Sequence, residues 1–103
     1  MAFTGNERHD VTLEDAQRLI RNYRRGAGAN DHRAGFFGRA AIEWLLAQPG
    51  CVGIRAYSAR QDNGQPTLVL VGVNANEQDI TATIIEDHIP CPPNCDPGSA
   101  LHV

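Results

Sequence analysis

The stretch from residue 67 to residue 73 constrains the fold of this chain more than any other part. Apart from Thr67 and Gly72, every residue in it is a leucine or a valine. Both alternating sets of positions along such a strand are therefore apolar. A strand of this kind is buried on both faces. We predict that residues 67–73 form the central strand of a sheet covered on both sides.

Two further segments indicate neighbouring strands. Residues 51–59 alternate between an apolar and a mixed set of positions, which predicts a half-buried strand. Residues 80–86 are rich in β-branched side chains, which favours a third strand, with a short helix as the alternative. An Asn63–Gly64 pair between the first two segments is typical of a tight hairpin turn. The pattern predicts a three-stranded antiparallel meander.

Two helices are predicted before the strands. Thr12 followed by Asp15 forms an approximate capping box, and apolar residues then recur at helical spacing, so we expect a helix over residues 12–25. A second helix is expected over residues 35–48, where apolar side chains cover most of the circumference. Such an apolar helix is either central in the fold or shared with another subunit.

These elements predict a single α+β domain over residues 1–103. Two N-terminal helices pack on one face of the three-stranded meander, residues 1–11 form a loose lead-in, and residues 88–103 form an irregular tail rich in proline and cysteine. The other face of the sheet would then be bare, although residues 67–73 are apolar on both sides. A homodimer formed by sheet stacking or by edge pairing would cover that face.

Composition narrows the classes of function. All nine basic residues are arginine and the net charge is −3. The absence of lysine excludes a Schiff-base lysine and a lysine-containing phosphate loop, and an acidic chain of this kind is a poor nucleic-acid binder. No apolar run reaches the roughly 18 residues needed to span a bilayer. The three cysteines, an odd number, and the lack of a secretory signal predict a cytoplasmic location and no membrane partner.

The cysteines suggest a metal or redox site. Cys91 and Cys95 lie four positions apart in a proline-rich segment, and Cys51, His88 and His102 are further candidate zinc ligands. The alternative is a reversible thiol pair. The prolines after Cys91 offer no amide hydrogen to a thiolate, and the spacing is one residue longer than a Cys-x-x-Cys redox motif. A passive disulfide and two free thiols therefore also stay open.

Arg55 and Tyr57 lie on the same face of the first predicted strand, where a guanidinium and a phenol together can receive an anionic ligand. The alternative is that Arg55 pairs with an acid of a neighbouring strand. For catalysis, a cysteine paired with a histidine, or Ser58 with His32, is conceivable, but no nucleophile elbow is present. We therefore predict no catalytic residues.

The segments Gly50–Tyr57, Thr67–Val73, Asp79–Ile80 and Cys91–Cys95 resemble parts of small bacterial proteins that have no assigned role. The resemblance covers the last half of the chain and implies a bacterial origin, and it assigns neither an activity nor site residues to this chain. The sequence thus predicts a cytoplasmic, homo-oligomeric, non-enzymatic module that binds a protein partner or a small ligand. A zinc-binding or thiol-redox protein centred on Cys91 and Cys95 is the alternative.

Overall fold

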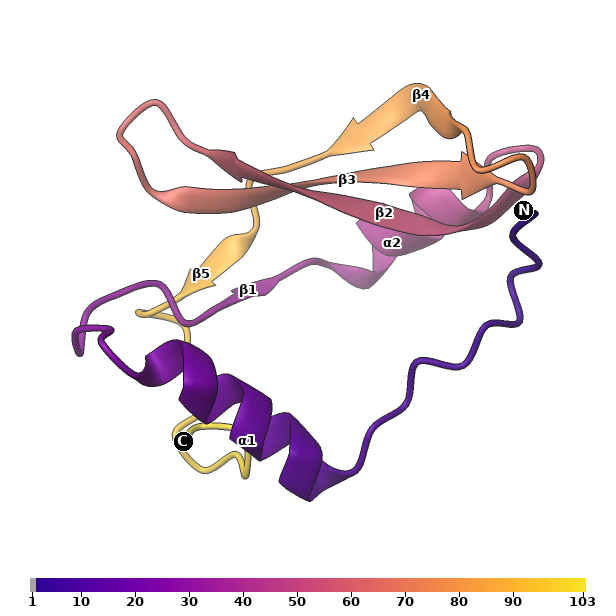
Figure 1. Cartoon of the computed structure of the whole chain (residues 1–103). Coiled ribbons are helices and arrows are strands. Elements are labelled where there is room, and N and C mark those ends of the chain that lie inside the picture. The colour runs from indigo at the N-terminus through magenta and orange to yellow at the C-terminus, as the bar shows by residue number, and fades with distance from the viewer. Residues whose placement is uncertain (1) are drawn as a thin grey trace. The chain divides into compact units, whose positions relative to one another are not determined.

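The computed structural model describes residues 2–103. Its elements are α1 (Leu13–Arg24), β1 (Ala34–Phe36), α2 (Arg39–Leu46), β2 (Cys51–Arg60), β3 (Pro66–Asn74), β4 (Asp79–Ile85) and β5 (Ile89–Cys91) (Figure 1). The chain divides into two compact units. The sheet unit contains the residues up to Glu7 and Gly35–Ile89, and the helical unit contains Arg8–Ala34 and Pro90–Val103. The α+β class is confirmed, and the single domain stays a prediction.

The sheet unit is built around the predicted meander. Strands β2, β3 and β4 pair in that order and are antiparallel, so β3 is central (Figure 1). Its side chains Leu70, Val71 and Val73 are each no more than 6% exposed, as its apolar sequence predicts. Residues 79–85 are a strand, so the helical alternative for this segment is wrong.

The turn between β2 and β3 is the one that Asn63 and Gly64 predict. Gln61 donates its backbone N–H to the carbonyl of Gln65 at 2.8 Å, and Gly64 donates to the carbonyl of Gln61 at 2.8 Å. Gly64 has a φ of 89°, a conformation that costs glycine little because it has no Cβ. The closed turn sets the register in which Ala59 faces Thr67.

The pairing of β4 with β3 is interrupted. Val71 pairs with Ile84, but the next residue, Gly72, pairs with Ile80, so residues 81–83 bulge out of the ladder. The backbone N–H of Thr83 is instead bonded to the side-chain oxygen of Gln48, just after α2, at 3.2 Å. The end of the second helix therefore fastens the bulge.

Helix α2 packs against all three strands of the sheet unit. Its Leu45 is 0% exposed. A Cβ built on Gly72 of β3 would lie 2.8 Å from the side-chain nitrogen of Gln48 and 3.4 Å from the carbonyl oxygen of Leu45. Glycine at position 72 thus allows the end of α2 to approach the strand closely.

The second helix is shorter than predicted. It begins after Gly38 and ends at Leu46, and residues 34–36 form strand β1 instead of its first turn. Residues 34–36 pair with β5, and a Cβ on Gly35 would lie 2.5 Å from the ring of His88. Leu45 is the one buried residue of α2, so a helix shared with another subunit stays a prediction.

The tail is not wholly irregular, which corrects the prediction for residues 88–103. Residues Ile89–Cys91 form β5, which pairs with β1 in a two-stranded sheet. The boundary between the two units falls inside both of these strands. Strands of three residues carry too little periodicity to be recognised in the sequence.

The helical unit contains α1 and the end of the chain. The hydroxyl of Thr12 accepts from the N–H of Asp15 at 3.1 Å, so the predicted cap and the helix over residues 12–25 are confirmed. Gln17 donates its side-chain amide to the carbonyl of Ala100 at 2.8 Å, which ties the tail to α1. No helix within residues 2–103 has the length and apolar character needed to cross a bilayer.

Candidate functional site

The structure brings Arg55 and Tyr57 together, as the strand pattern predicts, and adds Asp79 to them. Arg55 Nη1 donates to Asp79 Oδ1 at 2.5 Å, and the Tyr57 hydroxyl donates to Asp79 Oδ2 at 2.5 Å. Arg55 Nη2 also donates to the carbonyl of Glu77 at 3.3 Å. Asp79 thus occupies both side chains that were expected to receive a ligand.

The charges of this cluster stabilise each other. The hydrogen bond from Tyr57, followed by the bond and charge of Arg55, lowers the pKa of Asp79. The carboxylate of Asp79 in turn raises the pKa of Arg55. The guanidinium lies 6.0 Å from the centre of the Phe3 ring, a cation–π arrangement. The structure therefore contains the alternative arrangement, an arginine paired with an acid of its own sheet, and an anion site at Arg55 and Tyr57 stays a prediction.

This cluster should make the stability of the protein sensitive to acid. The folded-state pKa of Asp79 lies below its ordinary value of 3.8, so the unfolded chain takes up the proton first as the pH falls. Stability is then complete above about pH 4 and decreases as the pH falls further. We expect Asp79→Asn to flatten this decrease and Tyr57→Phe to flatten it in part. Urea unfolding from about pH 5 down to about pH 2 measures the slope, and an unchanged slope in Asp79→Asn would contradict the assignment.

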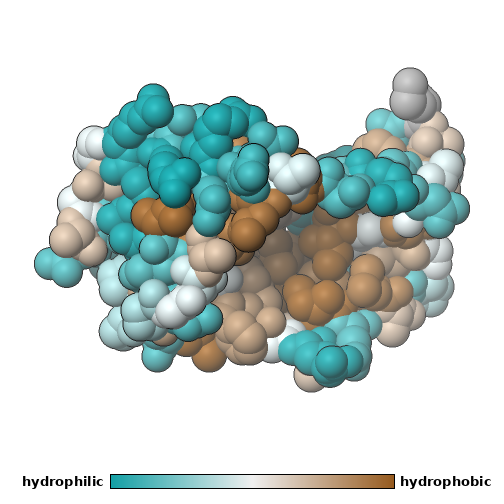
Figure 2. All heavy atoms as spheres, turned by 90° about the horizontal axis from the view of Figure 1, so that it is seen from below, coloured by the Kyte–Doolittle hydropathy of each residue, from teal (hydrophilic) through white to brown (hydrophobic). Residues whose placement is uncertain are grey.

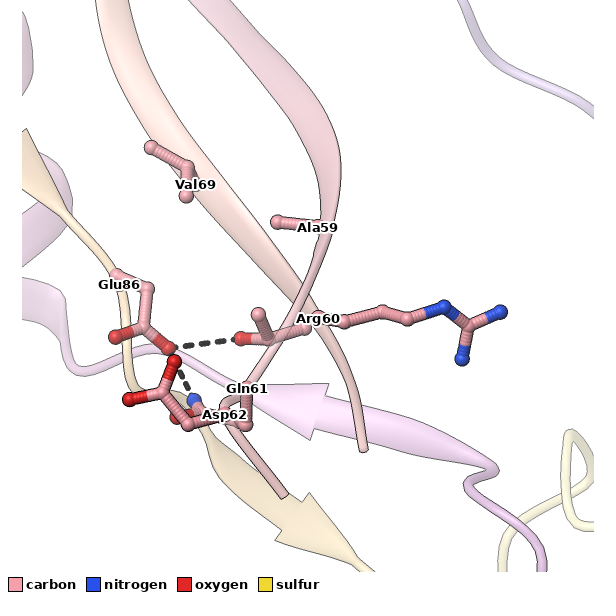
Figure 3. Close-up of a pocket in the computed structure, with 7 residues that line it drawn as sticks. Ala59, Arg60, Gln61, Asp62, Val69 and Glu86 are labelled. Atoms are coloured by element: carbon pink, nitrogen blue, oxygen red, sulfur yellow. Dashed lines mark hydrogen bonds between the residues drawn. The ribbon is translucent and has the colours of Figure 1, made fainter. Parts of the chain in front are cut away.

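A second polar cluster lies at the other end of the sheet, in a pocket of about 310 Å³. Figure 3 shows the Glu86 carboxylate receiving two bonds there. The side-chain amide of Gln61 donates at 2.5 Å and the hydroxyl of Thr67 donates at 2.9 Å. The side chain of Arg60 extends away from Glu86, and its guanidinium donates to the carbonyl of Gly64. The hydrogen bond from Thr67, the largest cause, lowers the pKa of Glu86.

Thr67 also contacts His88, but the geometry does not make a nucleophile. The hydroxyl lies 3.3 Å from His88 Nδ1. Because its single proton is donated to Glu86, the hydroxyl can only accept from the imidazole, so the histidine does not act as its base. Thr67 is also buried, at 6% exposed. This cluster holds the β2–β3 turn against the segment after β4.

The candidate zinc ligands do not form one group. Cys91 and Cys95 are joined in a disulfide, and the thiol of Cys51 donates to the carbonyl of Gly53 at 3.2 Å. The ring of His88 lies beside Phe37, with ring centres 5.8 Å apart. Across residues 2–103, no three histidine, cysteine or acidic side chains are arranged so that they could hold a metal ion. The structure thus pairs two of the predicted ligands with each other.

Large apolar side chains reach the surface of both units. In the sheet unit, Trp44 is 65%, Ile54 38% and Leu68 36% exposed. Figure 2 shows hydrophobic residues among the polar ones on the face that it presents. Trp44 and Phe36 are both more than half exposed, so neither lies in the core of this chain.

The polar partners Asp79, Gln61 and Glu86 were not identified from the sequence. Asp79 could have been predicted from the sequence. A hairpin that pairs Val73 with Asp79 places this acid on the same face of the sheet as Arg55. The register of that hairpin is set by Asn74, whose side-chain oxygen accepts from the N–H groups of Asn76 and Gln78. The Asn-rich turn was therefore the signal that could have found it.

Comparisons of this chain with protein-family models, with curated proteins and with solved structures give no match.

Proposed function

We propose that this protein is a non-enzymatic interaction module that forms a homodimer through the apolar surface of its sheet unit. We assign to that surface the exposed apolar side chains of α2 and of the sheet, Trp44, Leu46, Ile54 and Leu68. The observation that carries the proposal is that far more large apolar side chains are exposed than are fully buried. Leu45 is the one large side chain that is fully buried among residues 2–103, whereas thirteen large apolar residues are exposed. A chain with so small a core gains most from burying further apolar area against a partner.

The register of the sheet supports this surface. Ile54 lies opposite Gly72, and Leu68 lies an even number of residues from Gly72 on β3, so both point to the face on which α2 packs. Trp44 and Leu46 flank the buried Leu45 on α2. A second copy of this surface would extend the same apolar layer across the interface between the two copies.

The polar clusters support a binding role more than a catalytic one. Each carboxylate in them, Asp79 and Glu86, accepts two side-chain hydrogen bonds and has a lowered pKa, which makes it a weak base. The cytoplasmic location belongs to the same proposal. It is supported by Cys51, a free thiol on β2 that a reducing compartment would preserve, whereas the disulfide between Cys91 and Cys95 would be reduced there.

Light scattering on the purified chain tests the proposal. We expect a mass of two chains for the wild-type protein. Leu68→Glu should shift the equilibrium to the monomer, because it buries a charge without a partner in the interface. The matched control is Val11→Glu, which places the same charge at an exposed apolar position of the helical unit and should leave the dimer intact. A wild-type protein that stays monomeric at all concentrations would contradict the proposal.

A further inference from the structure

The disulfide between Cys91 and Cys95 closes a very short loop. The two residues are four positions apart, with their Cα atoms 4.9 Å from each other. A cross-link restricts the unfolded chain less as the loop that it closes becomes shorter. This bond is therefore among the least effective disulfides that a chain of this length could form for stabilising its fold.

The turn that carries the two cysteines is also held without the sulfur bond. Asn94 donates its backbone N–H to the carbonyl of Pro90 at 3.0 Å, and Cys95 donates to the carbonyl of Pro93 at 3.1 Å. At the start of the turn, the carbonyl of Cys91 accepts from the N–H of Arg33 at 2.7 Å. Opening the disulfide would leave these bonds in place, so the two thiols would stay close enough to re-form it.

The two cysteines of the disulfide differ in their exposure to solvent. Cys91 is 6% exposed, whereas Cys95 is half-buried. Attack on a disulfide requires a thiolate to reach one sulfur in line with the bond, so access decides which sulfur is attacked. The structure presents Cys95 to an attacking thiolate and shields Cys91, which becomes the leaving group.

We propose that Cys91 and Cys95 form a reversible redox site that exchanges with low-molecular-weight thiols, with Cys95 as the residue that carries the mixed disulfide. In the first step, the thiolate of the small molecule forms a bond to Cys95 Sγ while the bond between the two cysteines breaks, and Cys91 leaves as a thiolate. A second thiolate attacks the sulfur of the first small molecule, which releases the oxidised small-molecule disulfide and the Cys95 thiolate. Both cysteine thiolates take up protons from water, and the protein is reduced by two electrons.

Alkylation of the folded protein tests this site. The wild-type protein is incubated with reduced glutathione, alkylated with N-ethylmaleimide without denaturant, and analysed by mass spectrometry. Relative to the untreated protein, we expect one additional alkylated cysteine, Cys95, without denaturant and a second, Cys91, when denaturant is added before alkylation. At early times we also expect a glutathione adduct on the peptide that contains Cys95. A disulfide that opens only after unfolding, or an early adduct on Cys91, would overturn the proposal.

Two variants measure directly which of the two sulfurs reacts faster. Both also carry Cys51→Ser, which removes the third cysteine. Cys91→Ser leaves Cys95 as the single cysteine, and Cys95→Ser leaves Cys91. With oxidised glutathione we expect the first variant to be modified about tenfold faster than the second, because the rate follows thiol access. Equal rates, or faster reaction at Cys91, would overturn the assignment of Cys95. The wild-type experiment decides the proposal even if a variant does not fold.

Discussion

Replacing Leu45 by alanine should destabilise the protein by about 3 kcal/mol, within the range found for buried leucines. Leu45 is 0% exposed and lies where α2 meets the sheet, so its removal leaves a cavity at the centre of the small core of the sheet unit. For a domain of ordinary stability this is a large fraction of the free energy of unfolding. Urea denaturation followed by circular dichroism measures the change.

The neighbouring residue provides the matched control for this prediction. Leu46 is on the same helix but is 49% exposed. Because Leu46 belongs to the proposed dimer surface, both substitutions are compared in the monomeric Leu68→Glu variant. There Leu46→Ala removes the same atoms from the surface, so the free energy of unfolding should change by no more than about 0.5 kcal/mol. Equal effects of the two substitutions would show that α2 does not pack on the sheet through Leu45.

Gly35→Ala should cost about 2 kcal/mol, as expected for overpacking a filled site. The added Cβ would lie 2.5 Å from Cδ2 and 2.7 Å from Cγ of His88. The ring cannot move away freely, because it also contacts Thr67 and Phe37. We expect a lower urea midpoint with an unchanged slope of the unfolding transition.

Gly53→Ala is the control for this second prediction. Gly53 lies in β2, and a Cβ at this position meets nothing within 4 Å. Alanine should therefore be neutral or slightly stabilising, because it restricts the unfolded chain. If Gly35→Ala were as well tolerated as Gly53→Ala, the close packing of β1 against His88 would be wrong. A double variant with His88→Ala should recover part of the loss, since it removes the ring that the new Cβ meets.

The sequence predicts the elements whose signal is contained within a single segment. The apolar residues of 67–73 identify the central strand, Asn63 with Gly64 identifies the turn, and Thr12 identifies the start of α1. Each of these signals depends on neighbouring residues alone, through side-chain alternation, backbone conformation or capping. The predicted ranges of this strand and this helix agree with the observed ones to within one residue at each end.

Features that depend on contacts between distant segments could not be predicted from such local signals. The apolar composition of residues 35–48 favours a helix from the first residue, yet Gly35 and Phe36 belong to a strand because residues 89–91 pair with them. Likewise, Arg55 and Tyr57 were identified as neighbours on one strand, whereas their partner Asp79 depends on the register of two hairpins. Local propensity is overridden in such places by tertiary pairing.

The bulge at residues 81–83 has a consequence for how the protein behaves at high concentration. A regular edge strand offers a row of unpaired backbone groups on which further chains can add and grow into fibrils. In β4 the ladder is broken after Ile80, and the N–H of Thr83 is already bonded to Gln48. This edge therefore disfavours continuous strand addition along β4, even though the same unit carries exposed apolar side chains.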